Sequence, residues 1–193
     1  MKGPSVVIIG SGPSGFYTAE SITKRNNSDI DIIDRLPTPF GLIRGGVAPD
    51  HQTTKKISAS YTKTAKKNNV RFFGNIEIGK DILIEELRNM YDVVVLAIGS
   101  ELDNKLEIKG ANLKNVYGSA EFVGWYNGHP DYVNLNPNLD TKNVVVIGNG
   151  NVAIDIARVL SKTSDEMLTS DIPKNVLDVI NKSPIENLYI VGR

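Results

Sequence analysis

Cysteine is absent from the 193 residues of this chain. Its absence excludes disulfide bonds, thiolate metal ligands, a cysteine nucleophile and a Cys-x-x-Cys electron relay within these residues. Long apolar runs are also missing: the longest, Val6–Ile9 and Val93–Ile98, fall far short of the roughly 20 residues that a helix needs to cross a bilayer. We therefore expect a soluble chain of one or two globular domains without a transmembrane segment.

An excess of either charge is lacking as well. The 22 Lys and Arg residues balance 22 Asp and Glu residues, so the formal net charge is zero. Without a global positive field or a basic surface interleaved with aromatic side chains, the sequence argues against a nucleic-acid partner. Histidine is scarce, since only His51 and His129 are present, and no metal cluster or Ser-His-Asp set can be assembled.

Short apolar runs alternate with helix-like stretches along the chain. The runs do not alternate with polar residues, which is typical of parallel strands covered on both faces. The pattern predicts the α/β class. Strands are expected at residues 6–9, 30–33, 93–98, 144–147 and 188–191, helices at 14–24, 53–67, 82–90 and 152–161, and a surface connection at 127–141.

The segment Gly10-Ser11-Gly12-Pro13-Ser14-Gly15 fits the pattern G-x-G-x-x-G. It follows a strand and opens a helix, the context in which this pattern indicates dinucleotide binding. Gly10 permits the tight turn, Gly12 lets the backbone approach a pyrophosphate, and Gly15 lets the helix pack closely on the strand. The helix N-terminus then holds the anion. The alternative is a glycine-bearing turn without a ligand.

A carboxylate ends the second expected strand, because Asp34 lies 19 residues beyond Gly15. An acid at about this offset accepts hydrogen bonds from an adenosine ribose and repels a 2′-phosphate. The first site is therefore expected to take FAD or NAD rather than NADP. Asp31 is the competing carboxylate, but its place inside the strand disfavours it.

A second loop, Gly148-Asn149-Gly150-Asn151-Val152-Ala153, repeats the arrangement with alanine in the third small position. Residues 149–152 are expected to line a pyrophosphate. The strand that follows ends in Arg193, whose guanidinium suits a 2′-phosphate and so predicts NADP. The gap of 40 residues from Ala153 is twice the usual one, and we interpret residues 163–184 as an insertion. The alternative for Arg193 is an exposed terminal arginine.

Two sites of opposite ribose preference in one chain indicate a flavin that exchanges hydride with NADPH. The expected architecture is two Rossmann-like dinucleotide-binding units with parallel sheets, the second one incomplete. Residues 1–106 form the FAD-binding domain, and residues 107–193 form a linker and the NADP-binding domain.

Four further segments carry a resemblance to a known family. They are Pro39-Phe-Gly-Leu-Ile-Arg-Gly-Gly-Val-Ala-Pro-Asp-His51, Phe73-Gly-Asn-Ile-Glu-Ile-Gly79, Phe122-Val-Gly-Trp-Tyr-Asn-Gly128 and Gly148-Asn-Gly-Asn-Val-Ala-Ile-Asp-Ile-Ala-Arg158. With the glycine loops, they make the chain similar to the adrenodoxin reductase family of NADPH-dependent ferredoxin reductases. Family members are more than twice as long, so the resemblance implies an N-terminal fragment that lacks the segment completing the FAD domain.

The resemblance implies a flavoprotein that passes electrons from NADPH through FAD to a ferredoxin-type iron-sulfur protein. Carried over by position, the contacts to FAD are Gly12, Ser14, Asp34, Leu42, Ile78, Ala97 and Gly99, and those to NADP are Asn149, Gly150, Asn151, Val152 and Arg193. Asp34 departs from the glutamate more common in the family. A shorter acid would reach the ribose through water.

His51 is the candidate catalytic residue. It follows a Pro-Asp turn, and an imidazole there would orient the nicotinamide or relay a proton near the flavin. The alternative is that it caps the following helix. Arg44, in a glycine-rich loop, either faces the flavin or anchors the turn.

The charges are unevenly distributed. Residues 50–75 carry a net charge of +5 and residues 76–107 one of −5. A basic helix face would steer an acidic ferredoxin, although solvated lysines are the more frequent meaning of such a run.

Two other functions stay open at this point: an NADPH-using flavoprotein with another acceptor, and a non-catalytic nucleotide-binding module. Residues 1–4 resemble neither a secretory signal nor a transit peptide. We expect a bacterial cytoplasmic protein, and a processed protein of the mitochondrial matrix would look the same.

Overall fold

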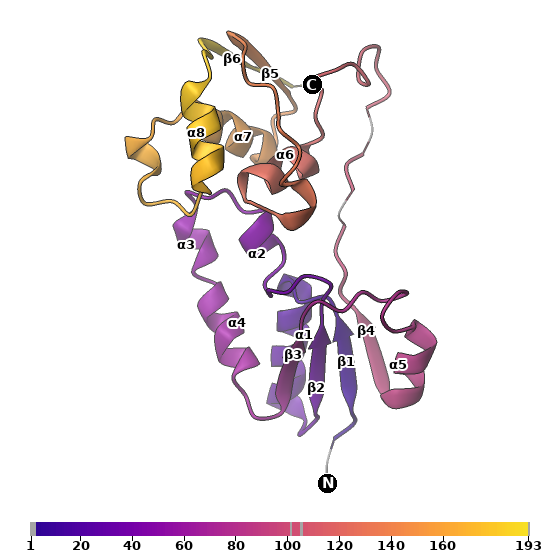
Figure 1. The fold of residues 1–193 in the computed structure, drawn as a ribbon. Coiled ribbons are helices and arrows are strands. Elements are labelled where there is room, and N and C mark those ends of the chain that lie inside the picture. Colours follow the sequence, from indigo (N-terminus) through magenta and orange to yellow (C-terminus); the bar gives the residue numbers. More distant parts are fainter. Residues whose placement is uncertain (1–2, 101, 105, 193) are drawn as a thin grey trace. The chain divides into compact units, whose positions relative to one another are not determined.

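The computed structural model describes residues 3–100, 102–104 and 106–192. The chain divides into two compact units (Figure 1). Unit 1 comprises Met1–Arg44 and Thr53–Ser100, and unit 2 comprises Gly45–Gln52 and Glu101–Arg193. The units therefore differ from the expected domains, because the segment 45–52 belongs to unit 2. Which cofactor each unit binds stays a prediction.

Unit 1 contains a four-stranded parallel sheet in the order β3-β2-β1-β4. The strands are β1 (Val6–Ile9), β2 (Ile30–Ile33), β3 (Val70–Phe73) and β4 (Val93–Leu96). Their last residues pair across the sheet, Ile9 with both Ile33 and Leu96, and Ile33 with Phe73. The loops that follow the strands consequently lie along one edge of the sheet, where open α/β sheets bind ligands.

Alternate residues of these strands feed two separate cores. Ile8 and Ile32 pack with Phe16 of α1 (Pro13–Arg25) and with Tyr61 of α4 (Ser58–Ala65). On the other face, Ile9 and Ile33 pack with Leu87 of α5 (Ile84–Met90). Burial on both faces explains why β1 is a continuous apolar run and why β2 is apolar at every residue except Asp31.

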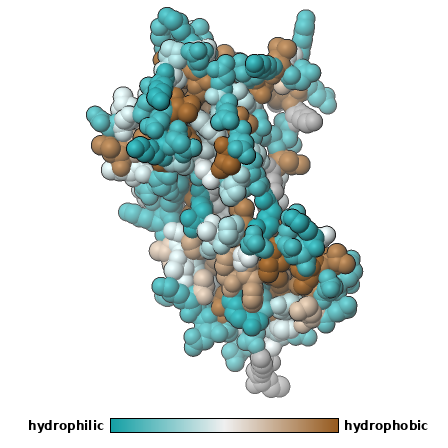
Figure 2. All heavy atoms as spheres, viewed as in Figure 1, coloured by the Kyte–Doolittle hydropathy of each residue, from teal (hydrophilic) through white to brown (hydrophobic). Residues whose placement is uncertain are grey.

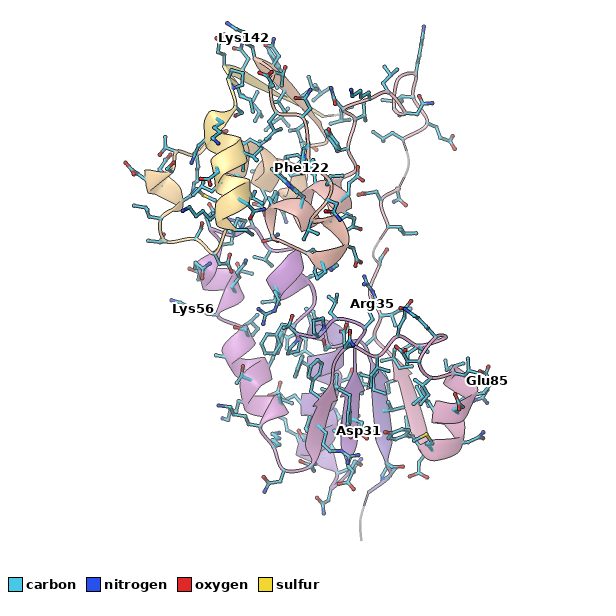
Figure 3. The ribbon with its side chains drawn as sticks, viewed as in Figure 1. Asp31, Arg35, Lys56, Glu85, Phe122 and Lys142 are labelled. Atoms are coloured by element: carbon cyan, nitrogen blue, oxygen red, sulfur yellow. The ribbon has the colours of Figure 1, made fainter. Side chains whose placement is uncertain are left out.

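Asp31 is the exception on the α5 face. Its side chain is 1% exposed and accepts hydrogen bonds from Arg71 Nε and Nη2, at 2.7 and 2.6 Å, and from Tyr91 Oη at 2.5 Å. Burial, followed by the hydrogen bond to Asp31, raises the pKa of Tyr91 to about 12. Figure 3 shows Asp31 among the strands, away from the sheet edge where Arg35 lies. The Asp31 carboxylate is therefore bound by side chains of its own unit, Arg71 and Tyr91.

Unit 2 is built around two parallel strands, β5 (Asn143–Ile147) and β6 (Asn187–Val191). Its longer helices are α6 (Ser119–Tyr126), α7 (Asn151–Ser161) and α8 (Lys174–Lys182), with single 3-10 turns at Pro130–Tyr132 and Asp165–Met167. One apolar cluster joins these elements and includes Phe122, Trp125, Val146, Val159 and Val176. Two short helices, α2 (Leu42–Gly45) and α3 (Gln52–Lys55), mark where the chain passes between the units.

The other face of the β5–β6 pair carries apolar side chains that are about half exposed. Val145 and Ile147 of β5 lie there beside Tyr189 and Val191 of β6, with exposed fractions between 51 and 57%. Figure 2 shows apolar side chains at the surface of each unit. Parallel strands are normally covered on both faces, so the half-exposed apolar side chains of this face are unusual for a parallel pair.

Several expected elements differ in the structure. The helix expected at 53–67 is split into α3 and α4, and around the break the backbone amides of Ile57, Ala59 and Ser60 donate to the carbonyl three residues earlier, as in a tighter 3-10 turn. The segment interpreted as an insertion, 163–184, contains α8. Strand β3 and helix α6 were not predicted. Every helix in the described part of the chain is too short or too polar to span a membrane.

Candidate dinucleotide-binding sites

The first glycine loop lies at the carboxyl edge of the sheet of unit 1. Gly10 has a φ of +107°, and a Cβ there would stand 2.3 Å from the carbonyl oxygen of Ala97. A Cβ on Gly15 would stand 2.1 Å from the carbonyl oxygen of Gly10. Both distances are far below van der Waals contact, so the backbone packing itself requires these two glycines.

Gly12 is different. Its φ of −77° suits any residue, and a Cβ there would meet only the Cα of Gly41, at 4.0 Å. It is the N-cap of α1, whose first turn has no acidic residue and receives no side-chain cap from the described residues. The first N–H groups of a helix lack intrahelical partners and attract anions. The space beside Gly12 and the uncapped α1 terminus therefore fit a pyrophosphate.

Asp34 lies against this loop. Its Oδ2 accepts hydrogen bonds from the Ser11 amide, at 2.8 Å, and the Ser11 hydroxyl, at 2.6 Å, while Oδ1 accepts from the Leu36 amide at 2.9 Å. A carboxylate has about four lone-pair sites, so Oδ1 retains capacity for a ribose hydroxyl. Between the two acids considered from the sequence, only Asp34 contacts the glycine loop in the described structure.

The segment after β2 forms a second wall beside the loop. The Phe40 amide donates to the Ser11 carbonyl at 3.0 Å, and a Cβ on Gly41 would lie 2.8 Å from the Cα of Gly12. Leu42 follows and is 64% exposed, and its contact with FAD stays a prediction. Arg44 donates to the Pro39 carbonyl at 3.2 Å and lies 5.8 Å above the Phe40 ring. These contacts favour the interpretation that Arg44 anchors the turn.

The remaining residues expected at FAD lie in different surroundings. Ser14 is exposed in the first turn of α1. The Ala97 amide donates to the Ile9 carbonyl at 2.7 Å, which places Ala97 beside Gly10. Gly99 has a φ of +71°, and no described atom lies within 4 Å of its Cβ position. Ile78 packs in the cluster on the α5 face and has no described contact with the loop. Its role stays a prediction.

The second glycine loop repeats the first in unit 2. Gly148 has a φ of +118°, and its amide donates to the Val191 carbonyl at 2.7 Å. Gly150 has a φ of −77°, and its Cβ position is free of described atoms within 4 Å. Asn151 and Val152 are exposed in the first turn of α7, which has no acidic residue or side-chain cap among the described residues. A pyrophosphate fits here for the same reasons.

Arg193 lies outside the described residues. Its neighbour Gly192 lies against the second loop, because a Cβ there would be 2.8 Å from the side-chain nitrogen of Asn149. The contact of Arg193 with a 2′-phosphate stays a prediction.

His51 belongs to unit 2, with the second loop. Its side chain is 44% exposed, and its Nδ1 lies 3.7 Å from Oδ2 of Asp155 in α7. The other Asp155 oxygen accepts from Arg158 Nη2 at 2.8 Å. Arg158 also pairs with Asp50, whose Oδ2 accepts from Lys162 Nζ at 2.6 Å as well. No group of His, Asp and Glu side chains in the described ranges is arranged to hold a metal ion.

The sequence did not predict this charged cluster. Asp50 and Asp155 lie in segments that carry the family resemblance, but spacing alone gave them no role. Burial by itself would raise the pKa of the Asp50 carboxyl. The hydrogen bonds from Lys162 and Arg158 outweigh that effect and hold its pKa below the ordinary range. The wholly buried Tyr126 lies near these charges, and its pKa is raised by burial and then by Asp155.

The Asp50 pairs should make stability depend on pH. Folding lowers the pKa of the Asp50 carboxyl. The stabilisation from its ion pairs is therefore complete above its pKa in the unfolded chain, about 3.9, and is lost as the pH falls through its pKa in the folded protein. We expect Asp50→Asn to lower the free energy of unfolding by about 2–3 kcal/mol at pH 7. This loss is smaller than for a fully buried ion pair, because both cations stay partly solvated. In urea denaturation, the difference in unfolding free energy between the wild type and the variant should disappear below about pH 4. A gap that is constant from neutral to acid pH would contradict the assignment.

Known proteins resemble this chain over most of its length. Residues 4–183 match the family described as pyridine nucleotide-disulphide oxidoreductase. The chain is 47% identical over 190 residues to the mitochondrial NADPH:adrenodoxin oxidoreductase of Arabidopsis thaliana, covering 97% of this chain and 39% of that protein. It is 43% identical over 194 residues to the NADPH-ferredoxin reductase FprA of Mycobacterium leprae, covering 97% of this chain and 42% of that protein.

A solved structure of Mycobacterium tuberculosis FprA in complex with NADPH matches with a TM-score of 0.95 and 40% identity, covering 100% of this chain and 44% of that one. The chain thus spans about two fifths of the length of the curated relatives it matches. The predicted resemblance to adrenodoxin reductases and the predicted α/β class with parallel sheets are confirmed. The chain belongs to the pyridine nucleotide-disulphide oxidoreductase family.

Proposed function

We propose that the protein is a flavoprotein oxidoreductase that passes electrons from NADPH through FAD to a ferredoxin-type iron-sulfur protein. The observation that carries this proposal is the pair of glycine loops, each ending in an uncapped helix N-terminus and each with open space at its middle glycine, Gly12 or Gly150. The relatives named for NADPH, adrenodoxin and ferredoxin support the cofactor and the partner. Disulfide chemistry is disfavoured because these residues contain no cysteine.

The residues of the first loop would hold FAD. The Gly12–Ser14 backbone and the α1 N-terminus bind the pyrophosphate, and Asp34, fixed by Ser11, accepts from the ribose. When bound, FAD accepts a hydride from a nicotinamide and releases electrons one at a time. The residues of the second loop, Asn149 to Val152, would bind the pyrophosphate of NADPH, and Arg193 its 2′-phosphate. His51 would act beside the nicotinamide as the catalytic residue.

Absorbance spectroscopy tests the proposal. The complete protein, purified with any sequence that accompanies residues 1–193, should be yellow, with flavin bands near roughly 370 and 450 nm. Anaerobic NADPH should bleach the band at the longer wavelength, and ferredoxin should restore it. A colourless protein, or a yellow one that NADPH does not bleach, would refute the proposal.

The ribose preference can be tested at Arg193. Replacing it with alanine should raise the KM for NADPH by about 10- to 100-fold, the effect of losing one charge-assisted contact worth about 1.5–3 kcal/mol. The KM for NADH should change little, because NADH lacks the phosphate. Equal changes for both nucleotides would remove Arg193 from the site.

We also propose that the iron-sulfur partner is acidic and meets the basic surface formed by α1 and α4. Lys67 of the segment after α4 donates to Thr23 of α1 at 2.6 Å. Lys24 pairs with Glu20 of α1 at 2.8 Å, and Lys24, Lys67 and Lys63 together lower the pKa of Glu20, which places three lysines around one acidic side chain. Ferredoxin reduction should slow by about tenfold or more as the ionic strength rises from about 10 to about 150 mM, because the Debye length falls from about 30 to about 8 Å. Rates that do not respond to salt would contradict an acidic partner.

For the compartment, we propose the bacterial cytoplasm. The relatives comprise both mitochondrial and bacterial proteins, so the mitochondrial matrix is the alternative.

A further inference from the structure

The segment Gly45–Gln52 is part of unit 2, although the residues on both sides of it belong to unit 1. Ala48 is completely buried in the apolar cluster of unit 2. The Pro49 carbonyl accepts a hydrogen bond from the Asp171 amide at 3.1 Å. The same apolar cluster contains Ile156, Val159 and Leu160 of α7, so the beginning of the turn is already held by apolar packing in the core that includes the helix after the second glycine loop.

Asp50 adds a charged connection to the same helix. One oxygen of its carboxylate is bound by both Arg158, in the last turns of α7, and Lys162, the residue that directly follows the helix. The Asp50 side chain is 7% exposed and each of the two cations is 27% exposed. The pairing therefore joins a buried carboxylate of the turn to two partly solvated cations at the end of α7.

His51 is the next residue, and its position depends on the same contacts. Its amide donates to the Ala48 carbonyl at 2.9 Å, which closes the turn. Its imidazole extends toward Asp155, one helical turn before Arg158. Because the Arg158 guanidinium binds both Asp50 and Asp155, a single side chain fixes the two carboxylates next to His51.

We propose that Asp50 is a positioning residue for His51: by binding Arg158 and Lys162 it keeps the imidazole at a fixed place relative to the helix that carries the second glycine loop. This inference rests on the proposed function, since it assumes that the nicotinamide end of NADPH is brought to His51. It gives a role to a residue that lies outside both glycine loops.

A double-mutant cycle on the complete flavin-loaded protein tests the inference. Asp50→Asn and His51→Gln should each slow flavin reduction by NADPH about tenfold in stopped-flow measurements, and the double variant should be no slower than the slower single variant. The matched control is Glu186→Gln, which removes a carboxylate from the surface pair with Lys142 in the same unit and should leave the rate unchanged. Effects that multiply, or an Asp50→Asn rate equal to that of the control, would overturn the proposal.

A second readout does not depend on turnover. Hydrogen exchange at the His51 amide should become faster in Asp50→Asn and remain unchanged in Glu186→Gln, because only the first variant frees the turn. Unchanged exchange in both variants would contradict the proposal.

If Asp50→Asn does not fold, Lys162→Met removes one of the two cations and keeps the Arg158 pair. It should show a smaller rate loss that again does not add to that of His51→Gln, and additive losses would overturn the inference. If NADPH does not reduce the flavin of the wild-type protein, the proposed function is refuted instead. Hydrogen exchange at the His51 amide then decides the role of Asp50.

Discussion

Replacing Gly12 with valine is expected to yield a folded but colourless protein. The φ of −77° at this position suits valine, and its Cβ would meet only the Cα of Gly41, at 4.0 Å, so folding is little affected. The added side chain would occupy the space in which the pyrophosphate approaches the α1 N-terminus. A steric conflict of more than about 3 kcal/mol would lower flavin affinity by more than about 100-fold.

The measurement is the ratio of flavin to protein absorbance after purification, together with circular dichroism to establish folding. Gly15→Val is the informative comparison, because its Cβ would stand 2.1 Å from the Gly10 carbonyl oxygen and the chain should fail to fold. Gly12→Ala adds a single carbon and should give an intermediate flavin content. A yellow Gly12→Val protein would show that no pyrophosphate lies at this loop.

The contrast between Gly12 and Gly15 explains how far the first site could be predicted. The motif and its context indicated a strand, a turn and a helix, and the structure has β1, the loop and α1 in those places. The sequence could not distinguish a glycine demanded by backbone packing from one that leaves room for a ligand. At Gly15 the crowding atom is the Gly10 carbonyl oxygen of the same loop, whereas the surroundings of Gly10 and Gly12 depend on Ala97 and Gly41, which are distant in sequence and reach the loop only through the fold.

Strands β1, β2, β4, β5 and β6 lie where apolar runs predicted them, since most of their residues are β-branched or apolar. Strand β3 was not predicted, although its four residues, Val-Arg-Phe-Phe, include as many apolar residues as the Ile-Asp-Ile-Ile of β2. Both strands carry one charged residue inside the run. The charge of Arg71 in β3 is neutralised by Asp31 of β2, 40 residues away, and this non-local pair makes the strand compatible with the sheet.

Helices α6 and α8 were missed for opposite reasons. Five consecutive residues of α6, 122–126, are buried, so no polar face marks the helix. In α8, Val176 and Ile180 have the spacing of a helix face, and a closer reading of that periodicity would have predicted it. The place of His51 could not be predicted, because the partners of Asp50 that hold its turn are 108 and 112 residues away in the sequence.

The second loop offers an independent expected result, the loss of NADPH binding in Gly150→Val without loss of flavin. The backbone at Gly150 accepts any residue, and no described atom lies within 4 Å of its Cβ position, so the variant should fold. The valine would occupy the space at the α7 N-terminus that the nucleotide pyrophosphate needs. By the same steric argument, NADPH affinity should fall by more than about 100-fold.

Titration of the flavin-loaded protein with NADP+ by calorimetry measures this loss directly, and the flavin spectrum serves as the internal reference because it depends on the other unit. Gly148→Val is the contrasting variant: its φ of +118° is strained for valine, so that variant should lose stability as well as binding. Wild-type affinity in a folded Gly150→Val protein would exclude the second loop from nucleotide binding. Loss of flavin and NADPH together would show that the two loops do not serve separate cofactors.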